Sequence, residues 1–222
     1  MELKGKKINF IGDSITEGAR VEKEENFYLN IIKREAGLAE ARNYGVGGSR
    51  IARLPKEKLE GIPSDEDFNM RAERMDKDFD AVVVFGGTND FGHGNIPLGT
   101  MEDNDPYTFY GALKTLCLYL IKNFPDKPIV FMTPLHRLNE ELDYRKRLAD
   151  GNPYARPIAD FVDAIKEVCR LFSIPVLDMF ENSGMPARVW AWCERYMPDG
   201  LHPNDEGQKL IAHKLQKFLE NL

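Results

Sequence analysis

The sequence predicts a single α/β domain in which a parallel sheet is covered by helices on both faces. Short apolar runs rich in Val, Ile and Phe alternate along the chain with longer segments whose apolar residues recur at spacings of three and four. This alternation is typical of strand–helix–strand units with right-handed crossovers. The chain has 222 residues and no repeat, linker or low-complexity tract, so we expect one domain over residues 1–222.

Five apolar segments are the expected strands of this sheet. The clearest is residues 81–85, which are continuously apolar, mostly β-branched and followed by Gly86-Gly87. The first segment stops abruptly at Gly12-Asp13-Ser14, and the second runs into the glycine-rich turn at residues 45–49. The five expected strands are residues 8–12, 41–44, 81–85, 129–132 and 175–178.

Helices are predicted between these strands, where apolar residues line one face. They cover residues 27–37, 65–75, 109–121, 158–172 and 210–222. Three other segments are rich in Gly, Pro, Asn, Asp or charge and are predicted to be loops, at residues 55–63, 91–107 and 135–157. Loops as long as the last two are often functional.

The composition excludes several kinds of partner. The net charge of −6 gives no reason to expect nucleic acid or an anionic membrane. No apolar run approaches the roughly 20 residues that a membrane-spanning helix requires. Residues 1–7 lead directly into the first strand without an apolar leader, which predicts a cytoplasmic protein. Homo-oligomer formation stays open.

The cysteines do not indicate a disulfide framework or a metal site. Cys117, Cys169 and Cys193 are odd in number, widely spaced and without the spacing of zinc ligands. Free cysteine on an apolar helix face usually packs as a small hydrophobe. We expect no catalytic cysteine, no bound metal and no cofactor.

Ser14 stands where the chemistry of such a fold is usually found. It follows the first strand, and ligands of parallel sheets gather at the carboxyl ends of the strands. A serine hydroxyl is a weak nucleophile that needs a base within hydrogen-bonding reach. Ser14 is therefore the candidate nucleophile, with a helix-capping role as the alternative.

His202 is the best candidate for the base among the four histidines. Asp199 precedes it by three residues in a loop that also contains Gly200 and Pro203, and an aspartate at that spacing can reach the imidazole ring. Such a carboxylate fixes the tautomer of the histidine and stabilises its charged form. His213 falls in the last predicted helix and His93 in a predicted loop, so neither is favoured.

Hydrolysis of an ester also requires hydrogen-bond donors for the developing oxyanion. Gly48 lies in the turn after the second strand, and Asn89 lies in the turn after the third. If these strands flank the first, both turns lie beside Ser14, and Gly48 would supply a backbone N–H and Asn89 a side-chain amide. Asp13, after the first strand, and Asp90, after the third, are expected to brace their turns by local hydrogen bonds.

At four separate blocks the sequence resembles the SGNH, or GDSL-type, serine esterases and lipases. These blocks are Gly12-Asp13-Ser14, Asn43 to Gly48, Gly87 to Asp90, and Asp199 to Pro203. The resemblance implies a three-layer α/β/α sandwich with a flavodoxin-like parallel sheet in the strand order 2-1-3-4-5. It also implies a Ser14–His202–Asp199 triad, an oxyanion hole at Ser14, Gly48 and Asn89, and metal-independent ester hydrolysis through an acyl-enzyme. Ile15 stands where the GDSL pattern has leucine.

Other classes of protein fit the sequence less well. An α/β-hydrolase would carry its serine in a G-x-S-x-G motif, and a nucleotide-binding module would need a glycine-rich phosphate loop; neither motif is present. A metallohydrolase built on Asp13, Asn89, Asp90 and His202 would be poor in histidine ligands. An inactive hydrolase fold is a fourth alternative, although every catalytic position is filled.

The substrate is predicted only in outline. The polar loops and the lack of an apolar lid favour a short acyl group, such as acetyl on a carbohydrate, and the alternative is a lysophospholipase or thioesterase. His136 and Arg137 follow the fourth strand and are candidate substrate contacts, or else a solvated pair. Trp190 and Trp192 precede the Asp199 loop and could wall the pocket, or else pack as the core of a short helix.

Overall fold

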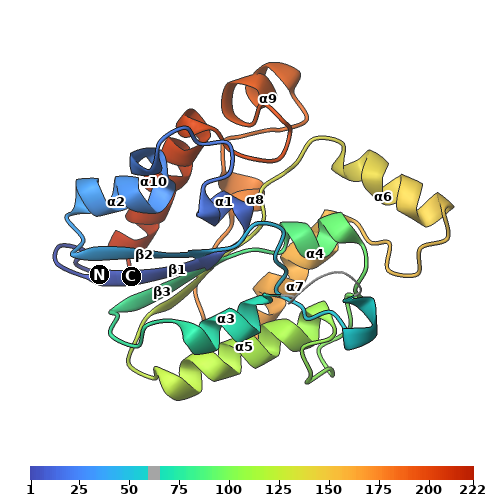
Figure 1. Cartoon of the computed structure of the whole chain (residues 1–222), viewed down its shortest axis with the longest axis horizontal. Coiled ribbons are helices and arrows are strands. Elements are labelled where there is room, and N and C mark those ends of the chain that lie inside the picture. The colour runs from blue at the N-terminus through green and yellow to red at the C-terminus, as the bar shows by residue number, and fades with distance from the viewer. Residues whose placement is uncertain (60–65) are drawn as a thin grey trace.

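The computed structural model places five parallel strands in one sheet, in the order β2-β1-β3-β4-β5. The structure describes residues 1–59 and 66–222. Figure 1 shows the strands running through the middle of the molecule. They are β1 (Lys7–Gly12), β2 (Glu40–Gly45), β3 (Ala81–Phe85), β4 (Ile129–Met132) and β5 (Val176–Leu177). The three-layer fold and its flavodoxin-like strand order are confirmed.

The helices connect these strands and continue beyond them. They are α1 (Ser14–Glu17), α2 (Tyr28–Ala36), α3 (Phe68–Arg74), α4 (Thr88–His93), α5 (Phe109–Asn123), α6 (Glu140–Ala149), α7 (Ile158–Leu171), α8 (Met179–Asn182), α9 (Trp190–Tyr196) and α10 (Asp205–Glu220). Short 3₁₀ turns cover Glu24–Asn26 and Lys56–Lys58. Helices α2, α5 and α7 match the predicted ranges closely.

Two predicted helix starts differ from the structure. Helix α10 begins five residues before the predicted Leu210, because the Asn204 side chain accepts hydrogen bonds from Glu206 N and Gly207 N and caps the helix there. Helix α3 begins at Phe68 and is capped by Asp67. The predicted start at Asp65, and residues 60–63 of the predicted 55–63 loop, lie outside the described residues.

The prediction of loops at residues 91–107 and 135–157 was partly wrong. Helix α4 extends into the first segment, and helix α6 occupies ten residues of the second. Helix α6 has no apolar stripe, since Leu142 and Leu148 are both exposed. Its three acidic residues in the first turn and two basic residues in the last turn instead stabilise it through the helix dipole. Apolar periodicity therefore could not identify it.

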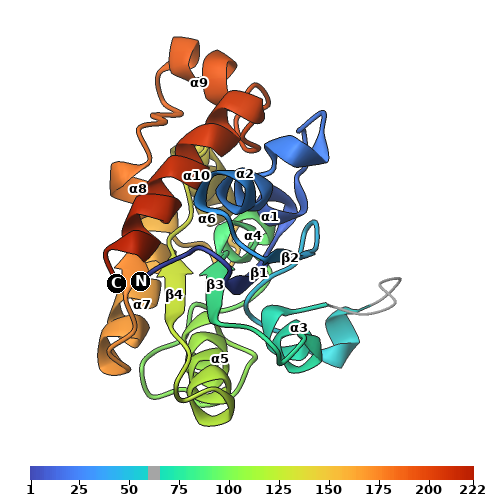
Figure 2. The same cartoon turned by 90° about the vertical axis from the view of Figure 1, so that its left-hand side faces the viewer.

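Alternate side chains of each strand pack into separate cores on the two faces of the sheet. Ile11 and Val84 contribute to the core beneath α3, α5 and α7. Phe10 and Val83 contribute to the core beneath α2 and α10. Figure 2 shows these two groups of helices on opposite sides of the strands. No helix in the described part of the chain is long and apolar enough to cross a membrane.

The fold brings three chain segments to one edge of the sheet. From β1 the chain crosses to β2 on one side, while β3 pairs with β1 on the other. The connections therefore diverge at β1, and ligands of such sheets bind at this switch point outside the carboxyl ends of the strands. Helix α1 leaves β1 here, the residue 46–49 turn leaves β2, and α4 leaves β3.

Candidate active site

Ser14 begins α1 directly after the end of β1. The capping role belongs to Asp13, whose carboxylate accepts a hydrogen bond from Ile15 N at 2.9 Å. The alternative of Ser14 as a cap is therefore not what the structure shows. The Ser14 side chain is nearly buried, with 8% of the residue exposed, and its hydroxyl points to another part of the chain.

That part is the loop before α10. Ser14 Oγ lies 3.0 Å from His202 Nε2, and His202 Nδ1 lies 2.8 Å from Asp199 Oδ2. The other carboxylate oxygen of Asp199 accepts hydrogen bonds from Leu201 N at 3.0 Å and His202 N at 2.7 Å. The three side chains form one hydrogen-bonded series.

The surroundings of Asp199 keep it ionised. Burial by itself would raise the pKa of the carboxyl, but the N–H groups and ring of His202, together with Leu201 N, lower that pKa to about 2. An ionised carboxylate beside Nδ1 holds the ring proton there, so the neutral ring presents the lone pair of Nε2 to Ser14. The carboxylate is also contacted by the exposed Arg20 guanidinium, whose Nε lies 3.3 Å from Asp199 Oδ2.

Gly48, in the turn after β2, and Asn89, at the start of the helix after β3, belong to segments that are joined by hydrogen bonds. Gly48 has a left-handed backbone with φ of +72°, and its carbonyl oxygen lies 3.0 Å from His93 Nε2. Asn89, on α4, donates from Nδ2 to the carbonyl of Ser49 at 3.0 Å. Asn89 and His93 are one helical turn apart, so α4 contacts two successive carbonyls of the Gly48 turn.

Two buried aspartates brace the strand-end turns; the bond of Asp13 is local, as predicted, but those of Asp90 are to residues far away in the sequence. Asp90 accepts hydrogen bonds from Ile51 N at 3.0 Å and Ala52 N at 2.9 Å. Burial raises the pKa of Asp90 to about 7 and that of Asp13 to about 6, against the lowering effect of their backbone hydrogen bonds. Neither carboxyl is in contact with Ser14 in any hydrogen bond of the described residues.

His136 and Arg137 are engaged by the protein itself. His136 Nδ1 lies 2.8 Å from Glu140 Oε1, and its ring packs on Phe180 with centroids 3.7 Å apart. Arg137 Nη1 donates to the carbonyl of Thr88, one residue before Asn89, at 3.2 Å. Arg137 therefore connects the loop after β4 to the helix that carries Asn89, and the solvated alternative does not describe it.

Trp190 and Trp192 lie on α9, the helix that precedes the Asp199 loop. Their exposed fractions are 57% and 43%, so the alternative of core packing does not apply to them. Cys193 and Tyr196 are the buried residues of this helix, and Trp192 stacks on the Tyr196 ring with centroids 5.5 Å apart. The two tryptophans are available on the surface.

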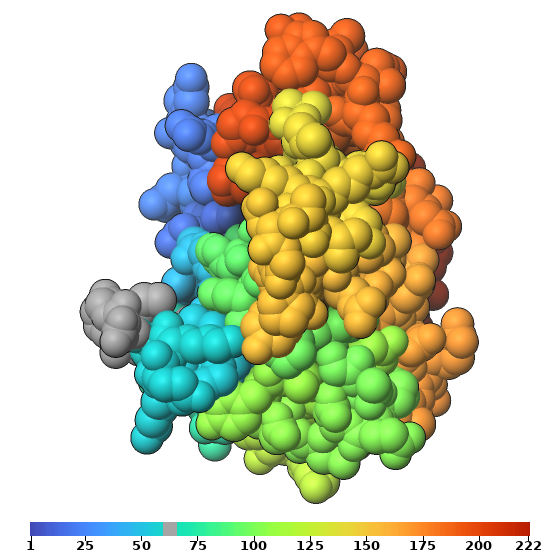
Figure 3. Space-filling model, turned by 90° about the vertical axis from the view of Figure 1, so that its right-hand side faces the viewer, coloured from blue at the N-terminus to red at the C-terminus, as the bar shows by residue number. Residues whose placement is uncertain are grey.

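A cavity of about 490 Å³ adjoins the His202 loop. It is lined by residues 137–142 together with Arg145 and Arg188. Leu138 N donates to the carbonyl of Gly200 at 2.8 Å, and this bond joins the cavity wall to the Asp199–His202 turn. Figure 3 shows the yellow segment that contains this wall beside the orange segment of α9.

One residue of the site, Arg71, was not predicted. It reaches from α3 to the ends of β1 and β2, where it contacts the carbonyls of Gly12 and Tyr44 and the hydroxyl of Ser49. An arginine inside a predicted helix carries no signal of such a role. Across residues 1–59 and 66–222, no group of three or more His, Cys, Asp or Glu side chains is placed to hold a metal ion.

The sequence model of the GDSL-like lipase/acylhydrolase family matches residues 10–210. The matched region contains all of the strand-end turns and the Asp199–His202 loop. The chain belongs to this family. It is a hydrolase of the ester-cleaving type, in agreement with the resemblance found in the four sequence blocks. A search of curated proteins found no match.

Solved structures of this GDSL-like protein's relatives share its fold. A protein from Lactobacillus plantarum is 29% identical, with 98% of each chain covered and a TM-score of 0.82. A structure described as a possible lipase from Chitinophaga pinensis is 22% identical, with 97% and 98% covered and a TM-score of 0.66. The lipase/acylhydrolase from Enterococcus faecalis is 20% identical, with 97% and 96% covered and a TM-score of 0.61.

Proposed function

We propose that this GDSL-like hydrolase cleaves carboxylic esters through an acyl-enzyme formed on Ser14. The observation that carries the proposal is the hydrogen-bonded series from Ser14 Oγ through His202 to Asp199, at 3.0 Å and 2.8 Å. A serine, a base and an orienting carboxylate in that order are the parts that an activated nucleophile requires.

In the first half of the reaction, Ser14 Oγ attacks the carbonyl carbon while His202 Nε2 takes the hydroxyl proton. Asp199, ionised because of its low pKa, stabilises the imidazolium. The negative oxygen of the tetrahedral intermediate is bound by the N–H groups of Ser14 and Gly48 and by the second amide hydrogen of Asn89, since the first is donated to Ser49. The C–O bond then breaks, and His202 gives its proton to the departing alcohol.

In the second half, water attacks the acyl-enzyme. His202 Nε2 takes a proton from this water, and the same donors bind the new oxyanion. When the intermediate collapses, the proton returns to Ser14 Oγ and the carboxylic acid is released. No metal or cofactor takes part in this scheme.

The proposed substrate is a short-chain ester, such as an acetyl group on a carbohydrate. The cavity whose wall binds the Gly200 carbonyl through Leu138 N has charged walls, with Arg145 paired to Glu141 and Arg188 paired to Glu140. A charged wall of this kind suits the hydroxyl groups of a sugar better than a long acyl chain. The exposed Trp190 and Trp192 offer flat apolar surfaces on which a sugar ring can stack.

The test compares p-nitrophenyl acetate, butyrate and octanoate, and then an acetylated sugar, in the presence of EDTA. We expect the highest kcat/KM with acetate, and a loss of roughly 10³-fold or more in Ser14→Ala. The matched control is Ser173→Ala, a change to an exposed serine after α7. Wild-type rates in folded Ser14→Ala would refute the mechanism. A preference for octanoate would point to the lysophospholipase or thioesterase alternative, and inactivity on every ester to an inactive fold.

A further inference from the structure

A single buried guanidinium joins the two strands that lead into the candidate site. Arg71 of α3 donates from Nη1 to the carbonyls of Gly12, at 3.0 Å, and Tyr44. From Nη2 it donates to Ser49 Oγ at 2.7 Å. Only 5% of Arg71 is exposed, so these bonds are shielded from water. The residue thus connects the end of β1, the end of β2 and the turn after β2.

The partners of Arg71 are immediate neighbours of the proposed catalytic groups. Gly12 is two residues before Ser14, and Ser49 directly follows Gly48. The same Ser49 donates from Oγ to the carbonyl of Val46 at 2.6 Å and accepts at its own carbonyl from Asn89. Arg71 therefore holds the nucleophile turn and the Gly48 turn at a fixed separation, and the Asn89 amide is tied to the same point.

Arg71 is also a fixed positive charge behind these turns. Burial lowers the pKa of its guanidinium to about 10, opposed first by the nearby Asp13 carboxylate, so the group stays protonated at neutral pH. It has no ion-pair partner among the residues that the structure describes, and its guanidinium carbon Cζ lies 4.6 Å from the centre of the Phe68 ring. Its hydrogen bonds are to neutral groups: Nε donates to the Glu66 carbonyl at 2.8 Å, and the two terminal nitrogens donate to the strand ends and to Ser49.

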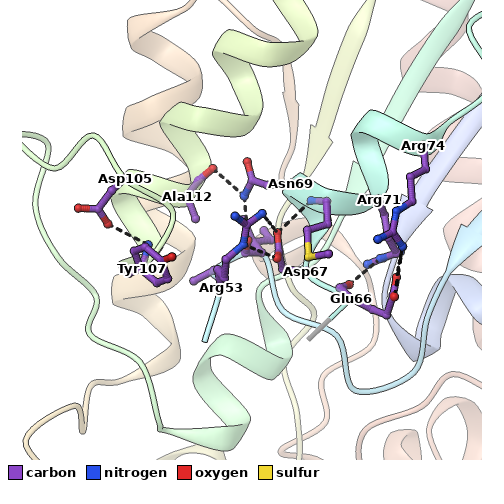
Figure 4. Close-up of polar contacts among 12 residues, drawn as sticks. Arg53, Glu66, Asp67, Asn69, Arg71, Arg74, Asp105, Tyr107 and Ala112 are labelled. Atoms are coloured by element: carbon purple, nitrogen blue, oxygen red, sulfur yellow. Dashed lines mark hydrogen bonds and ion pairs between the residues drawn. The ribbon is translucent and has the colours of Figure 1, made fainter. Parts of the chain in front are cut away.

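Other residues anchor α3 to the body of the protein. Asp67 caps the helix and accepts a hydrogen bond from Arg53 Nε at 2.8 Å. Asn69 donates to the carbonyls of Ile51 and Ala112 at 3.1 Å and 3.3 Å. Figure 4 shows these anchors on one side of α3 and Arg71, next to Glu66, on the other. Loss of the Arg71 guanidinium therefore leaves α3 attached.

We propose that Arg71 is a positioning residue for the oxyanion hole. It aligns the N–H groups of Ser14 and Gly48 and the Asn89 amide with the oxygen of the tetrahedral intermediate. This inference rests on the proposed serine mechanism. Because the alignment matters most when the oxygen carries its negative charge, Arg71 contributes to the transition state more than to the binding of substrate.

The test compares Arg71→Met, Arg71→Lys and Ser49→Ala, with Arg74→Met as the control. Methionine has a long apolar side chain that can fill the space beside Phe68, but it has neither a donor nor a charge. Arg74 lies on the same helix, is exposed and pairs with Glu66, so its replacement removes an equal charge without a contact to the site. The concentration of reactive Ser14 is measured by titration with a phosphonate, and kcat and KM are expressed per reactive site.

We expect kcat in Arg71→Met to fall by about 100-fold while KM stays within about twofold. Arg71→Lys replaces the planar guanidinium by a single ammonium group, and Ser49→Ala removes the link from Arg71 to the Gly48 turn together with the Ser49–Val46 hydrogen bond. We expect kcat to fall about tenfold in each variant. The affinity for a boronic acid, whose adduct with Ser14 carries a negative oxygen, should weaken in proportion to kcat/KM.

Two results would overturn this inference. If titrated Arg71→Met has the wild-type kcat, or if its boronic acid affinity is unchanged, the residue serves only the stability of the fold. A result in which wild-type and Ser14→Ala proteins hydrolyse esters equally would instead refute the proposed function, and the role of Arg71 with it. Arg74→Met should match the wild type in every measurement.

Discussion

Ser14 Oγ and His202 Nε2 lie 3.0 Å apart although 188 residues separate them in the chain. The first residue stands at the end of β1 and the second in the turn before α10. The two residues are positioned independently of each other. The end of β1 positions Ser14, and the hydrogen bonds of the Asp199 turn position His202. The relationship leads to predictions about pH, about the oxyanion donors and about the turns that hold them.

The activity should fall at low pH because a protonated His202 cannot accept the Ser14 proton. Asp199, with a pKa of about 2, stays ionised across this range, so the carboxylate does not limit the rate. The variant Arg20→Gln loses the positive charge beside Asp199, so Asp199 stabilises the imidazolium of His202 more strongly. The acid limb of the kcat/KM profile should therefore move to higher pH.

Since Arg20 is largely exposed, this shift should be small, on the order of a few tenths of a pH unit, and should shrink with added salt. The measurement is a profile of kcat/KM against pH at low and high salt. A flat profile between about pH 5 and pH 8 would be incompatible with His202 as the base. A shift of the acid limb to lower pH would contradict the contact between Arg20 and Asp199.

Asn89→Ala should lower kcat by about 10- to 100-fold with little change in KM, since the amide is proposed to bind the oxyanion rather than the substrate. Steady-state kinetics with a short ester tests this. Asn123→Ala, which removes an exposed amide that binds the Tyr119 carbonyl on α5, provides the matched control. An equal rise in KM with constant kcat would show that Asn89 binds the ground state instead.

Asp90→Asn should change how the free energy of unfolding depends on pH. Burial raises the pKa of Asp90 to about 7 from an ordinary value of 3.8, so folding favours its protonated form. The wild type therefore loses stability from this group as the pH rises from about 4 towards 7, whereas asparagine does not titrate.

Asparagine has only one oxygen for the N–H groups of Ile51 and Ala52, so the variant should be less stable at about pH 5, on the order of 1 kcal/mol. The difference in the free energy of unfolding between the wild type and Asp90→Asn should become smaller as the pH rises to about 7.5. Urea unfolding at both pH values measures this difference. Parallel stability curves for the two proteins would mean that Asp90 does not titrate in this range.

Gly45→Ala should displace α1 and with it Ser14. A Cβ at Gly45 would lie 2.2 Å from the backbone nitrogen of Glu17, and backbone atoms cannot give way without moving the helix. A Cβ at Gly47 would instead meet the flexible end of the Glu17 side chain, at 2.7 Å, so Gly47→Ala is the matched control.

We expect Gly45→Ala to lose about 1–3 kcal/mol of stability and most of its esterase activity, whereas Gly47→Ala should stay close to the wild type in stability. Thermal unfolding and kcat on one ester measure both effects. If Gly45→Ala and Gly47→Ala are equally stable, the close approach of α1 to β2 does not require glycine at position 45.

The sequence by itself determined the strands, their buried character and the turns that end them. Runs such as residues 81–85 record burial on both faces of a sheet, and the Gly12-Asp13-Ser14 and Asp199 to His202 segments are local enough for residue type and spacing to predict their geometry. The pairing of Ser14 with His202 could be predicted because Asp199 precedes this histidine at a suitable spacing and because both residues fall in blocks that resemble the GDSL-type esterases. The catalytic roles assigned to them stay predictions.

Only the tertiary structure decided which side chains hold these turns together. Arg71 and His93 contact the Gly12 and Gly48 turns from separate helices, and neither has a local pattern that points to a backbone carbonyl far away in the chain. Helix α6 was missed for a different reason, since its stabilising charges are local but it has no apolar stripe for periodicity to detect. Periodicity reports how a residue faces the core, whereas a hydrogen bond depends on what the complete fold places opposite the donor.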